Sequence, residues 1–469
     1  MTLPLWLAPR LDAVDTSWFE RFWPLSQGRS GHPDTQGLVL SGGGARGSFQ
    51  IGALRYLYDH DLIAPTKIAA VSAGSIIGAM LAQSTDPAVQ REQLMVLERY
   101  WLAMTDPSDM FTEQAWFQRL REQWSELSGV LPEWGTDSPL GVAAADAADE
   151  AGVKAALRDD PSLDASGDFN LAALWQIAQA LPRIGRAGAG LAGTLRGAGA
   201  AASAYRPGPI VSRLLFESGF SKTAVRTSGV ELRMGFVGLN SGELRFMRQD
   251  GVIVDTADAP VSDQSFDLTF GIWASCAIPG VFRPVQLGDD VYVDGGVRQN
   301  VPVDVAIRQL GVPRPYVIAS TAQQIETGDY TTQGVVASMI RSMSLLMDEA
   351  GRAEIEWART AGCTVIEPLF EVHSAMGFDP VSLQVNRDYG WMRAAGAVAV
   401  SPATPESVET DLPSRIAQAR IDLHRLLTAD APARAVKRAR QKVRTLVASA
   451  APGTVPDEAA AWDDEPAAT

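Results

Sequence analysis

Cysteines, histidines and long apolar runs are all scarce in this chain of 469 residues. The two cysteines, Cys276 and Cys363, belong to no CxxC or Cys/His cluster, so they predict neither a disulfide framework nor a metal site. No window approaches the roughly 18 consecutive apolar residues that a membrane-spanning helix needs. The first residues also lack the basic segment that opens a secretion signal. These absences favour a cytoplasmic protein that holds no metal ion.

Basic residues are also fewer than acidic ones. The chain has 40 Lys and Arg against 55 Asp and Glu, which gives a formal net charge of −15. Proteins that bind nucleic acid need clustered cations in a favourable overall field, so this balance argues against a nucleic-acid partner. The hydrophobic fraction of 46% and the charged fraction of 20% are ordinary for a globular protein, and we expect most of the chain to fold.

Short apolar strands alternate with helices from residue 37 onward. The first two expected strands, residues 38–40 and 68–71, are each followed by a turn of small residues and a helix. Such alternation predicts an α/β fold, with a parallel sheet covered by helices on both faces. Further strands are expected at residues 231–237, 251–254, 290–293, 316–320 and 363–366, and a helix at 334–360.

Shifts in composition divide the chain into five expected segments. These are a helical arm at 1–35, an α/β domain at 36–325, its continuation at 326–410, a helical segment at 411–450 and an acidic flexible tail at 451–469. Within the domain, residues 85–205 are predicted to be a helical insertion. Its glycine-rich end, residues 185–203, is open to two interpretations, a mobile lid or a plain surface linker.

Ser72 lies where an apolar strand meets a turn of small residues. Residues 67–80 read KIAAVSAGSIIGAM, which indicates a strand, a tight turn and an apolar helix. A serine on such a turn is lifted clear of the backbone, and the N-terminus of the next helix favours negative charge nearby. We therefore predict that Ser72 is a nucleophile.

A glycine-rich turn, residues 42–47 with the sequence GGGARG, follows the first strand. Backbone amides of such a turn can converge on one anion. The spacing of Gly42, Gly44 and Gly47 also fits the GxGxxG pattern of dinucleotide-binding proteins. That function expects an acidic residue at the end of the second strand, where this chain has Ser72. The pattern therefore favours an oxyanion-binding turn, with nucleotide binding as the weaker alternative.

A serine nucleophile needs a base, and Asp294 is the best candidate. Among the four histidines only His373, in a loop, is worth considering for this role. Asp294 closes the expected strand 291–293 and opens a Gly295-Gly296 turn. A buried carboxylate of raised basicity can take the proton of a serine directly. The competing interpretation of an Asp-Gly-Gly sequence is a simple hairpin turn.

Along the chain, the glycine-rich turn, the Ser72 turn and the Asp294 turn follow one another. Together they resemble the patatin-like phospholipase family, over roughly residues 36–309. Two further stretches, residues 274–284 and 300–302, also look familial. The resemblance implies a three-layer α/β sandwich with a mainly parallel central sheet, here with a helical insertion and a helical C-terminal extension. By position it implies a Ser-Asp dyad and an oxyanion loop, and it implies no cofactor. The matching residues are Ser72 as nucleophile, Asp294 as base, Gly42, Gly43 and Gly44 as the oxyanion loop, and Arg46 as the arginine that follows the glycines.

The implied activity is that of a lipid acyl hydrolase of phospholipase A or lysophospholipase type. Its substrates would be phospholipids or lysophospholipids, cleaved through an acyl-enzyme. Ala70 stands where the Gly-x-Ser-x-Gly elbow of the family usually has its first glycine. This departure motivates the alternative of a non-catalytic lipid-binding or scaffold protein with the same fold.

A basic run near the C-terminus bears on membrane contact. Its cations alternate with apolar residues at a helical spacing, which fits either peripheral contact with anionic lipid or a solvated helix paired with this acidic protein. The cations are Arg434, Lys437, Arg438, Arg440, Lys442 and Arg444.

Overall fold

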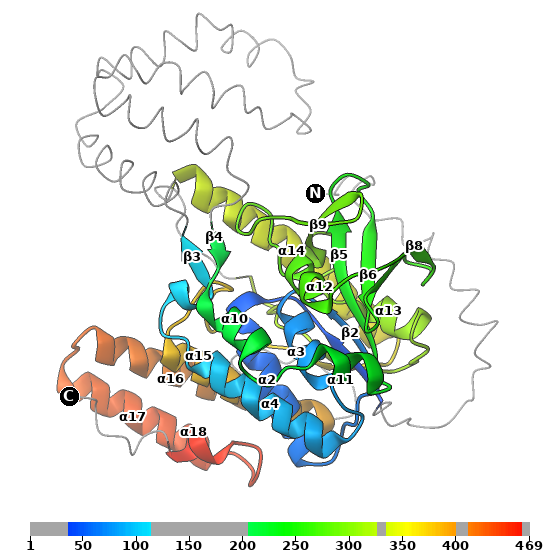
Figure 1. Ribbon diagram of the computed structural model, residues 1–469. Coiled ribbons are helices and arrows are strands. Elements are labelled where there is room, and N and C mark those ends of the chain that lie inside the picture. The colour runs from blue at the N-terminus through cyan, green and yellow to red at the C-terminus, as the bar shows by residue number, and fades with distance from the viewer. Residues whose placement is uncertain (1–35, 114–204, 326–333, 400–410, 462–469) are drawn as a thin grey trace, which may run out of the picture. The chain divides into compact units, whose positions relative to one another are not determined.

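The computed structural model describes residues 36–113, 205–325, 334–399 and 411–461 (Figure 1). The predicted helical arm at 1–35 and the predictions for residues 114–204, including the glycine-rich stretch, lie outside the described residues. Where the insertion begins, α4 (Pro87–Leu102) and η3 (Pro107–Asp109) are followed by β3 (Phe111–Glu113), which pairs antiparallel with β4 (Tyr205–Pro207). The predicted helical insertion is thus helical in α4, whereas β3 and β4 are strands.

One half of a ten-stranded sheet is parallel. Its strands lie in the order β12 (Thr364–Ile366), β11 (Tyr316–Ile318), β1 (Gly37–Leu40), β2 (Lys67–Val71) and β5 (Glu231–Gly238). Parallel strands are covered on both faces, which explains why β1 and β2 read as continuous apolar runs. The five strand predictions for this half, at 38–40, 68–71, 231–237, 316–320 and 363–366, are confirmed to within a few residues.

The other half of the sheet is antiparallel, so the expectation of a mainly parallel sheet is wrong there. β6 (Leu244–Arg248), β7 (Val252–Val254) and β8 (Pro260–Ser265) follow β5 in succession, and β10 (Asp290–Asp294) pairs with both β5 and β9 (Val285–Leu287). Short turns join β5 to β6, β6 to β7, β7 to β8 and β9 to β10, and only antiparallel neighbours can use such turns. Three of these strands, β6, β8 and β9, had not been predicted.

Helices cover both faces of the sheet, which confirms the α/β layering (Figure 1). Leu38 and Leu40 of β1 point into one buried cluster and Val39 into the other, as the alternation of side chains along a strand requires. The first cluster includes residues of α2 (Gly47–Asp59), α3 (Ala73–Leu81), α4, α10 (Pro209–Phe216), α11 (Lys222–Thr227), α12 (Leu268–Ser275) and α15 (Pro380–Ala399). The second includes residues of α13 (Val303–Arg308) and α14 (Gly334–Thr360).

The C-terminal segment is helical, as expected, but it forms two helices. α16 (Leu412–Thr428) and α17 (Ala433–Ala448) are separated at Pro432, and α16 packs between α15 and α17 (Figure 1). The expected flexible tail at 451–469 includes a short helix, α18 (Asp457–Ala461), whose Glu458 pairs with Arg55 of α2 at 3.0 Å. No helix within the described ranges is long and apolar enough to cross a membrane.

Candidate active site

Two strands bring Ser72 and Asp294 together by sharing one edge of β5. β2 pairs with β5 as far as Val71 opposite Gly235, and β10 pairs from Asp294 opposite Phe236. β6 occupies the opposite edge of β5 along the same residues. β2 runs parallel to β5, and β10 runs antiparallel to it. The carboxyl ends of β2 and β10 therefore meet on this edge of β5, beside the adjacent residues Gly235 and Phe236. This places the predicted nucleophile and base next to each other, although 221 positions (294 − 72 − 1) lie between them in the chain.

Ser72 adopts a backbone conformation that few residues other than glycine visit. Its φ is 54° and its ψ is −127°, and α3 begins at the next residue. Such strained conformations persist only where the surrounding structure enforces them, and they cluster at functional sites. A Cβ added to Gly74 would lie 2.6 Å from the carbonyl oxygen of Leu40, so only glycine fits two residues after Ser72.

Ala70 is accommodated without strain in the elbow. It is fully buried within β2, in register with Leu40 and Met234, and its φ is not positive. Its methyl group faces Gly78 of α3, where a glycine leaves room for it: a Cβ added to Gly78 would lie 3.4 Å from that of Ala70. The departure from the Gly-x-Ser-x-Gly pattern therefore does not distort the turn.

Asp294 is a buried carboxyl group with a raised pKa. Burial raises its pKa from 3.8 to about 7, while the nearby Ser72 hydroxyl and the Gly296 amide act to lower it. Its Oδ1 accepts from the Gly296 N–H at 2.8 Å. Its Oδ2 is buried and accepts no well-aligned hydrogen bond from any described residue. In enzymes without substrate, catalytic hydrogen bonds are often long or poorly aligned and tighten in the complex.

The glycine loop abuts the nucleophile, but one of its three amides is already used. A Cβ added to Gly42 would lie 3.2 Å from the Cβ of Ser72. The Gly42 N–H, which was predicted to bind an oxyanion together with its two neighbours, donates here to the carbonyl of Asn300 at 3.0 Å. The amides of Gly43 and Gly44 donate to no described residue. In this loop, these two N–H groups are therefore the candidates for binding an oxyanion.

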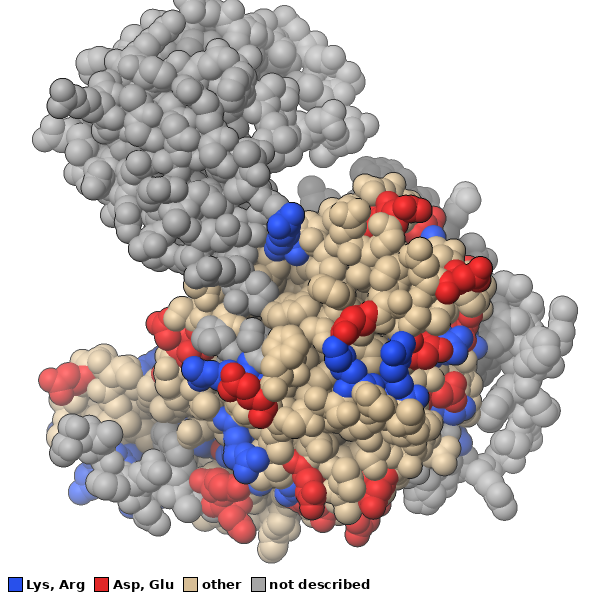
Figure 2. Space-filling view, viewed as in Figure 1, with Lys and Arg blue, Asp and Glu red and all other residues tan. Residues whose placement is uncertain are grey.

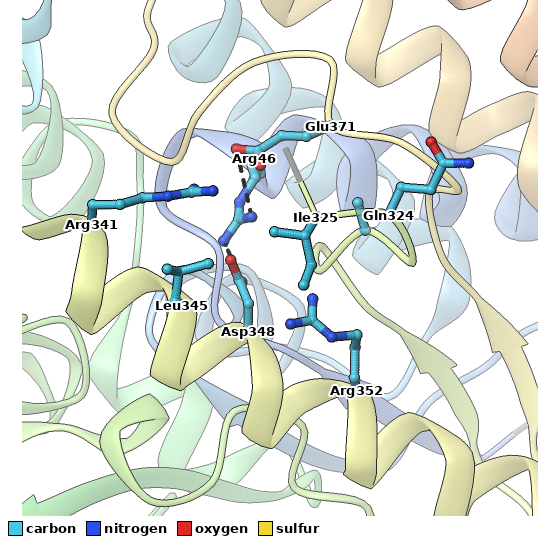
Figure 3. Close-up of a pocket in the computed structure, with 9 residues that line it drawn as sticks. Arg46, Gln324, Ile325, Arg341, Leu345, Asp348, Arg352 and Glu371 are labelled. Carbon is cyan, nitrogen blue, oxygen red and sulfur yellow. Dashed lines mark hydrogen bonds and ion pairs between the residues drawn. The ribbon is translucent and has the colours of Figure 1, made fainter. Parts of the chain in front are cut away.

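Arg46 ties the glycine loop to two distant segments (Figure 3). Its Nη2 lies 3.1 Å from Asp348 of α14, and its Nη1 lies 3.7 Å from Glu371. Its Nε also donates to the carbonyl of Gly43 at 3.3 Å. The arginine thus fixes the backbone of the loop from which it comes. Figure 3 shows a pocket around this ion pair that is also lined by Arg341, Leu345 and Gln324.

Sequence reasoning missed the part that α14 plays in this region. The half-buried Glu354 of α14 accepts from the N–H groups of Asn300 at 3.0 Å and Val301 at 2.6 Å, and removal from water raises the pKa of this glutamate to about 8. The Asn300 side chain in turn donates to Thr321 at 3.2 Å. Residues 300–302 had been noted as familial. The sequence pattern predicts α14 as a helix, but it does not indicate that this helix contacts the loop at Asn300 and Val301.

His373 does not act as the partner of Ser72 in this structure. Its Nδ1 lies 2.9 Å from the carbonyl of Ser374, and burial lowers its pKa to about 4, with Arg46 also lowering it and Asp379 raising it. The Nδ1 of His60 lies 2.9 Å from the carbonyl oxygen of Tyr56, and the Nε2 of His424 lies 3.2 Å from the carboxylate of Asp379. In the described part of the chain, no group of three or more His, Cys, Asp or Glu residues could hold a metal ion.

The model of the patatin-like phospholipase family matches residues 38–307, which include the glycine loop, Ser72 and Asp294. The chain belongs to the patatin-like phospholipase family. This membership confirms the resemblance found in the sequence, and with it the patatin fold, whose sheet is here mixed rather than mainly parallel.

Two solved structures are similar to this patatin-like chain at low sequence identity. VipD from Legionella pneumophila is 14% identical, with 89% of this chain and 80% of that chain covered and a TM-score of 0.36. The ExoU–SpcU complex of the type III secretion system of Pseudomonas aeruginosa is 16% identical, with coverage of 92% and 69% and a TM-score of 0.25. No curated protein matched the sequence.

Proposed function

We propose that this protein hydrolyses carboxylic esters of membrane lipids, as a phospholipase A or lysophospholipase, through a Ser72–Asp294 dyad. The observation that carries the proposal is the meeting of β2 and β10 on one edge of β5. It sets a buried carboxyl group beside a serine on a strained turn, next to a glycine loop with two unused amides. Family membership supports a lipid ester as the substrate.

In the proposed mechanism, the Asp294 carboxylate takes the hydroxyl proton as the Ser72 oxygen attacks the ester carbonyl. The resulting oxyanion accepts hydrogen bonds from the amides of Gly43 and Gly44. Collapse of the tetrahedral intermediate passes the proton to the leaving alcohol and leaves an acyl group on Ser72. Asp294 then takes a proton from a water molecule as the water oxygen attacks the acyl carbonyl. Collapse of this second intermediate breaks the bond to the Ser72 oxygen, returns the proton from Asp294 to that oxygen and releases the fatty acid. Removal of one oxyanion donor typically costs about 3 kcal/mol of transition-state stabilisation, so the glycine loop is central to the mechanism.

Substrate entry requires some rearrangement around the dyad. Ser72 is 3% exposed and Asp294 is 0% exposed. Two segments cover the neighbouring loops: Met347 of α14 lies so close to Gly296 that a Cβ there would be 2.4 Å from the Met347 Cε, and the carbonyl of Ala375 accepts from Ala45 at 2.8 Å. We infer that α14 and the loop around Ala375 shift when an acyl chain binds.

The direct test is fatty-acid release from phosphatidylcholine and lysophosphatidylcholine by the wild type, Ser72→Ala and Asp294→Asn. We expect release by the wild type and a loss of at least about 1,000-fold in both variants, because either change removes the proton transfer that activates the nucleophile. Release by Ser72→Ala at the rate of the wild type would contradict the proposal. Lipid binding without release by any form would favour the non-catalytic alternative. Calorimetry that shows NAD or ATP binding would favour the nucleotide-binding alternative.

The proposed partner surface for peripheral membrane contact is the outward face of α17. This helix of 16 residues carries six Lys and Arg residues and no acidic residue. Its Val443 and Leu446 are buried, while Arg434, Lys437 and Arg438 are exposed. With the apolar side turned inward, the helix offers an electrostatic surface for anionic lipid rather than an inserting one.

A further inference from the structure

Ser275 stands at the centre of a buried group of hydrogen bonds beneath the elbow. It is the last residue of α12, and its side chain is fully buried. The Ser275 Oγ lies 2.9 Å from the amide nitrogen of Ser72, 2.8 Å from the Oγ of Ser75 and 2.7 Å from the carbonyl oxygen of Gly235. One hydroxyl group therefore contacts the nucleophile backbone, its helix and the neighbouring strand.

The direction of each hydrogen bond follows from the chemistry of the partners. The carbonyl oxygen of Gly235 can only accept, so the single hydroxyl proton of Ser275 is donated to it. The Ser275 oxygen then has two lone pairs, which accept from the Ser72 N–H and the Ser75 O–H. The bond to Gly235 and the bond from Ser72 fix the rotamer of Ser275, and the Ser75 O–H occupies the remaining lone pair of its oxygen.

The Gly235 carbonyl is the point at which the two halves of the dyad meet. Gly235 pairs with Val71, and the next residue, Phe236, pairs with Asp294. A Cβ added to Gly295 would lie 2.6 Å from the same carbonyl oxygen, so the turn that follows Asp294 rests directly on it. A group that binds both this carbonyl and the Ser72 amide therefore holds the nucleophile in register with its base.

We propose that Ser275 is a positioning residue that holds the main chain of Ser72 in its strained conformation and so aims the Ser72 hydroxyl at Asp294. This inference rests on the proposed function and adds to it a residue with its own role. The carbonyl of Ser72 is held separately, by the N–H of Ser75 at 2.8 Å. Among the described residues, the amide side of Ser72 is held by Ser275. Loss of this acceptor leaves a buried N–H unpaired and allows the peptide to rotate.

The experiment compares Ser275→Thr with Ser275→Val. The two new side chains have the same shape, but threonine keeps the hydroxyl group and valine has a methyl group in its place. The readouts are the second-order rate at which a small fluorophosphonate acylates Ser72, and kcat and KM on a soluble ester. We expect Ser275→Val to lose about 100-fold in acylation rate and in kcat with little change in KM, because displacement of a reacting atom by about 1 Å costs this much. Ser275→Thr should stay within about threefold of Ser275 itself.

The matched control is Ser75→Ala, which removes another buried partner of Ser275 but leaves its bonds to Ser72 and Gly235 in place. Its acylation rate should stay near that of the wild type. The inference is overturned if folded Ser275→Val reacts like the wild type, if folded Ser275→Thr is as slow as Ser275→Val, or if Ser75→Ala is equally slow. Absence of reaction in the wild type would instead overturn the proposed function.

A second measurement on the wild type keeps the inference testable if Ser275→Val does not fold. Hydrogen exchange at the Ser72 amide should be as slow as at the paired amides of β2, because the N–H is buried and donates to Ser275. Rapid exchange at this amide would show that the bond does not hold the elbow, and would overturn the inference.

Discussion

Asp294 is the residue at which activity and stability oppose each other. Its pKa is raised by burial to about 7, so a substantial fraction of the carboxyl group is protonated near neutral pH. Only the carboxylate can take the proton of Ser72. We therefore expect kcat/KM on a soluble ester to rise with pH through about 7 and then level off. A profile that is flat between about pH 5 and 9 would contradict the role of Asp294 as base.

The same shift in pKa makes a prediction about stability. Between about pH 4 and 7 the folded state binds the Asp294 proton more tightly than the unfolded state does. The stabilisation is therefore fully present below the unfolded pKa and is lost as the pH rises through about 7. The neutral isostere in Asp294→Asn avoids the buried charge, so we expect a higher melting temperature than that of the wild type at pH 8 and a smaller difference at pH 5.

Asp290, four residues earlier on the same strand, provides the control for that measurement. Burial acts to raise its pKa, but hydrogen bonds from Ser241, Asn240 and Val291 outweigh this effect and lower it. The sign is opposite, so Asp290→Asn should lower the melting temperature at pH 8. If both variants shift the melting temperature in the same direction at pH 8, burial does not govern the titration of Asp294.

At the scale of elements, the sequence predicts best what is local. β1, β2, β5 and β10 are apolar runs that end in Gly-rich or Ser-containing turns, and both strand ends that hold the dyad were located from this pattern. β8 escaped prediction because it is solvent-exposed along its whole length and reads PVSDQS, which has no apolar periodicity. The contact of β10 with the same edge of β5 as β2 depends on tertiary pairing. No spacing in the chain reveals it.

The interactions of α14 were equally hidden from the sequence. Asp348 and Glu354 look like ordinary surface acids of an amphipathic helix, yet they bind Arg46 and the backbone at Asn300 and Val301. Their partners lie 302 and about 54 positions away in the chain. The function of Arg46 as a link between segments, rather than only a residue that follows the glycines, came from these contacts.

A substitution in α14 tests this link. Glu354→Ala removes the acceptor of two backbone N–H groups next to the active site, and each buried N–H left unpaired costs about 1–3 kcal/mol. We expect a drop of at least this size in the free energy of unfolding, measured by urea denaturation, together with slower ester hydrolysis. Glu349→Ala, on the exposed side of the same helix, should change the free energy of unfolding by less than about 0.5 kcal/mol. Equal effects would contradict the structural role of Glu354.

At the scale of the whole molecule, the distribution of charge matters more than its sum. The net charge is −15, and on the face shown in Figure 2 acidic and basic side chains are interspersed over the described residues. α17 departs from this mixture, since all its charged residues are basic. A local concentration of cations can attract an anionic surface even when the protein as a whole is acidic, provided that the distance is within the screening length.

Vesicle binding tests the proposed role of α17. The triple variant Arg434→Ala, Lys437→Ala and Arg438→Ala should bind vesicles rich in phosphatidylserine at least about tenfold more weakly than the wild type, because each surface cation contributes about 1 kcal/mol. Added salt should weaken the binding of the wild type, and pure phosphatidylcholine vesicles serve as the control. Binding of the triple variant at the strength of the wild type would assign membrane contact to another surface.

The most direct test of the dyad is the pH dependence of fluorophosphonate acylation, with the modified residue located by peptide mass. We predict a single adduct on Ser72 whose rate of formation rises through about pH 7, and a loss of this reaction in folded Asp294→Asn. An adduct on a different serine, or a rate at Ser72 that is unchanged in Asp294→Asn, would contradict the claim that these two side chains act together.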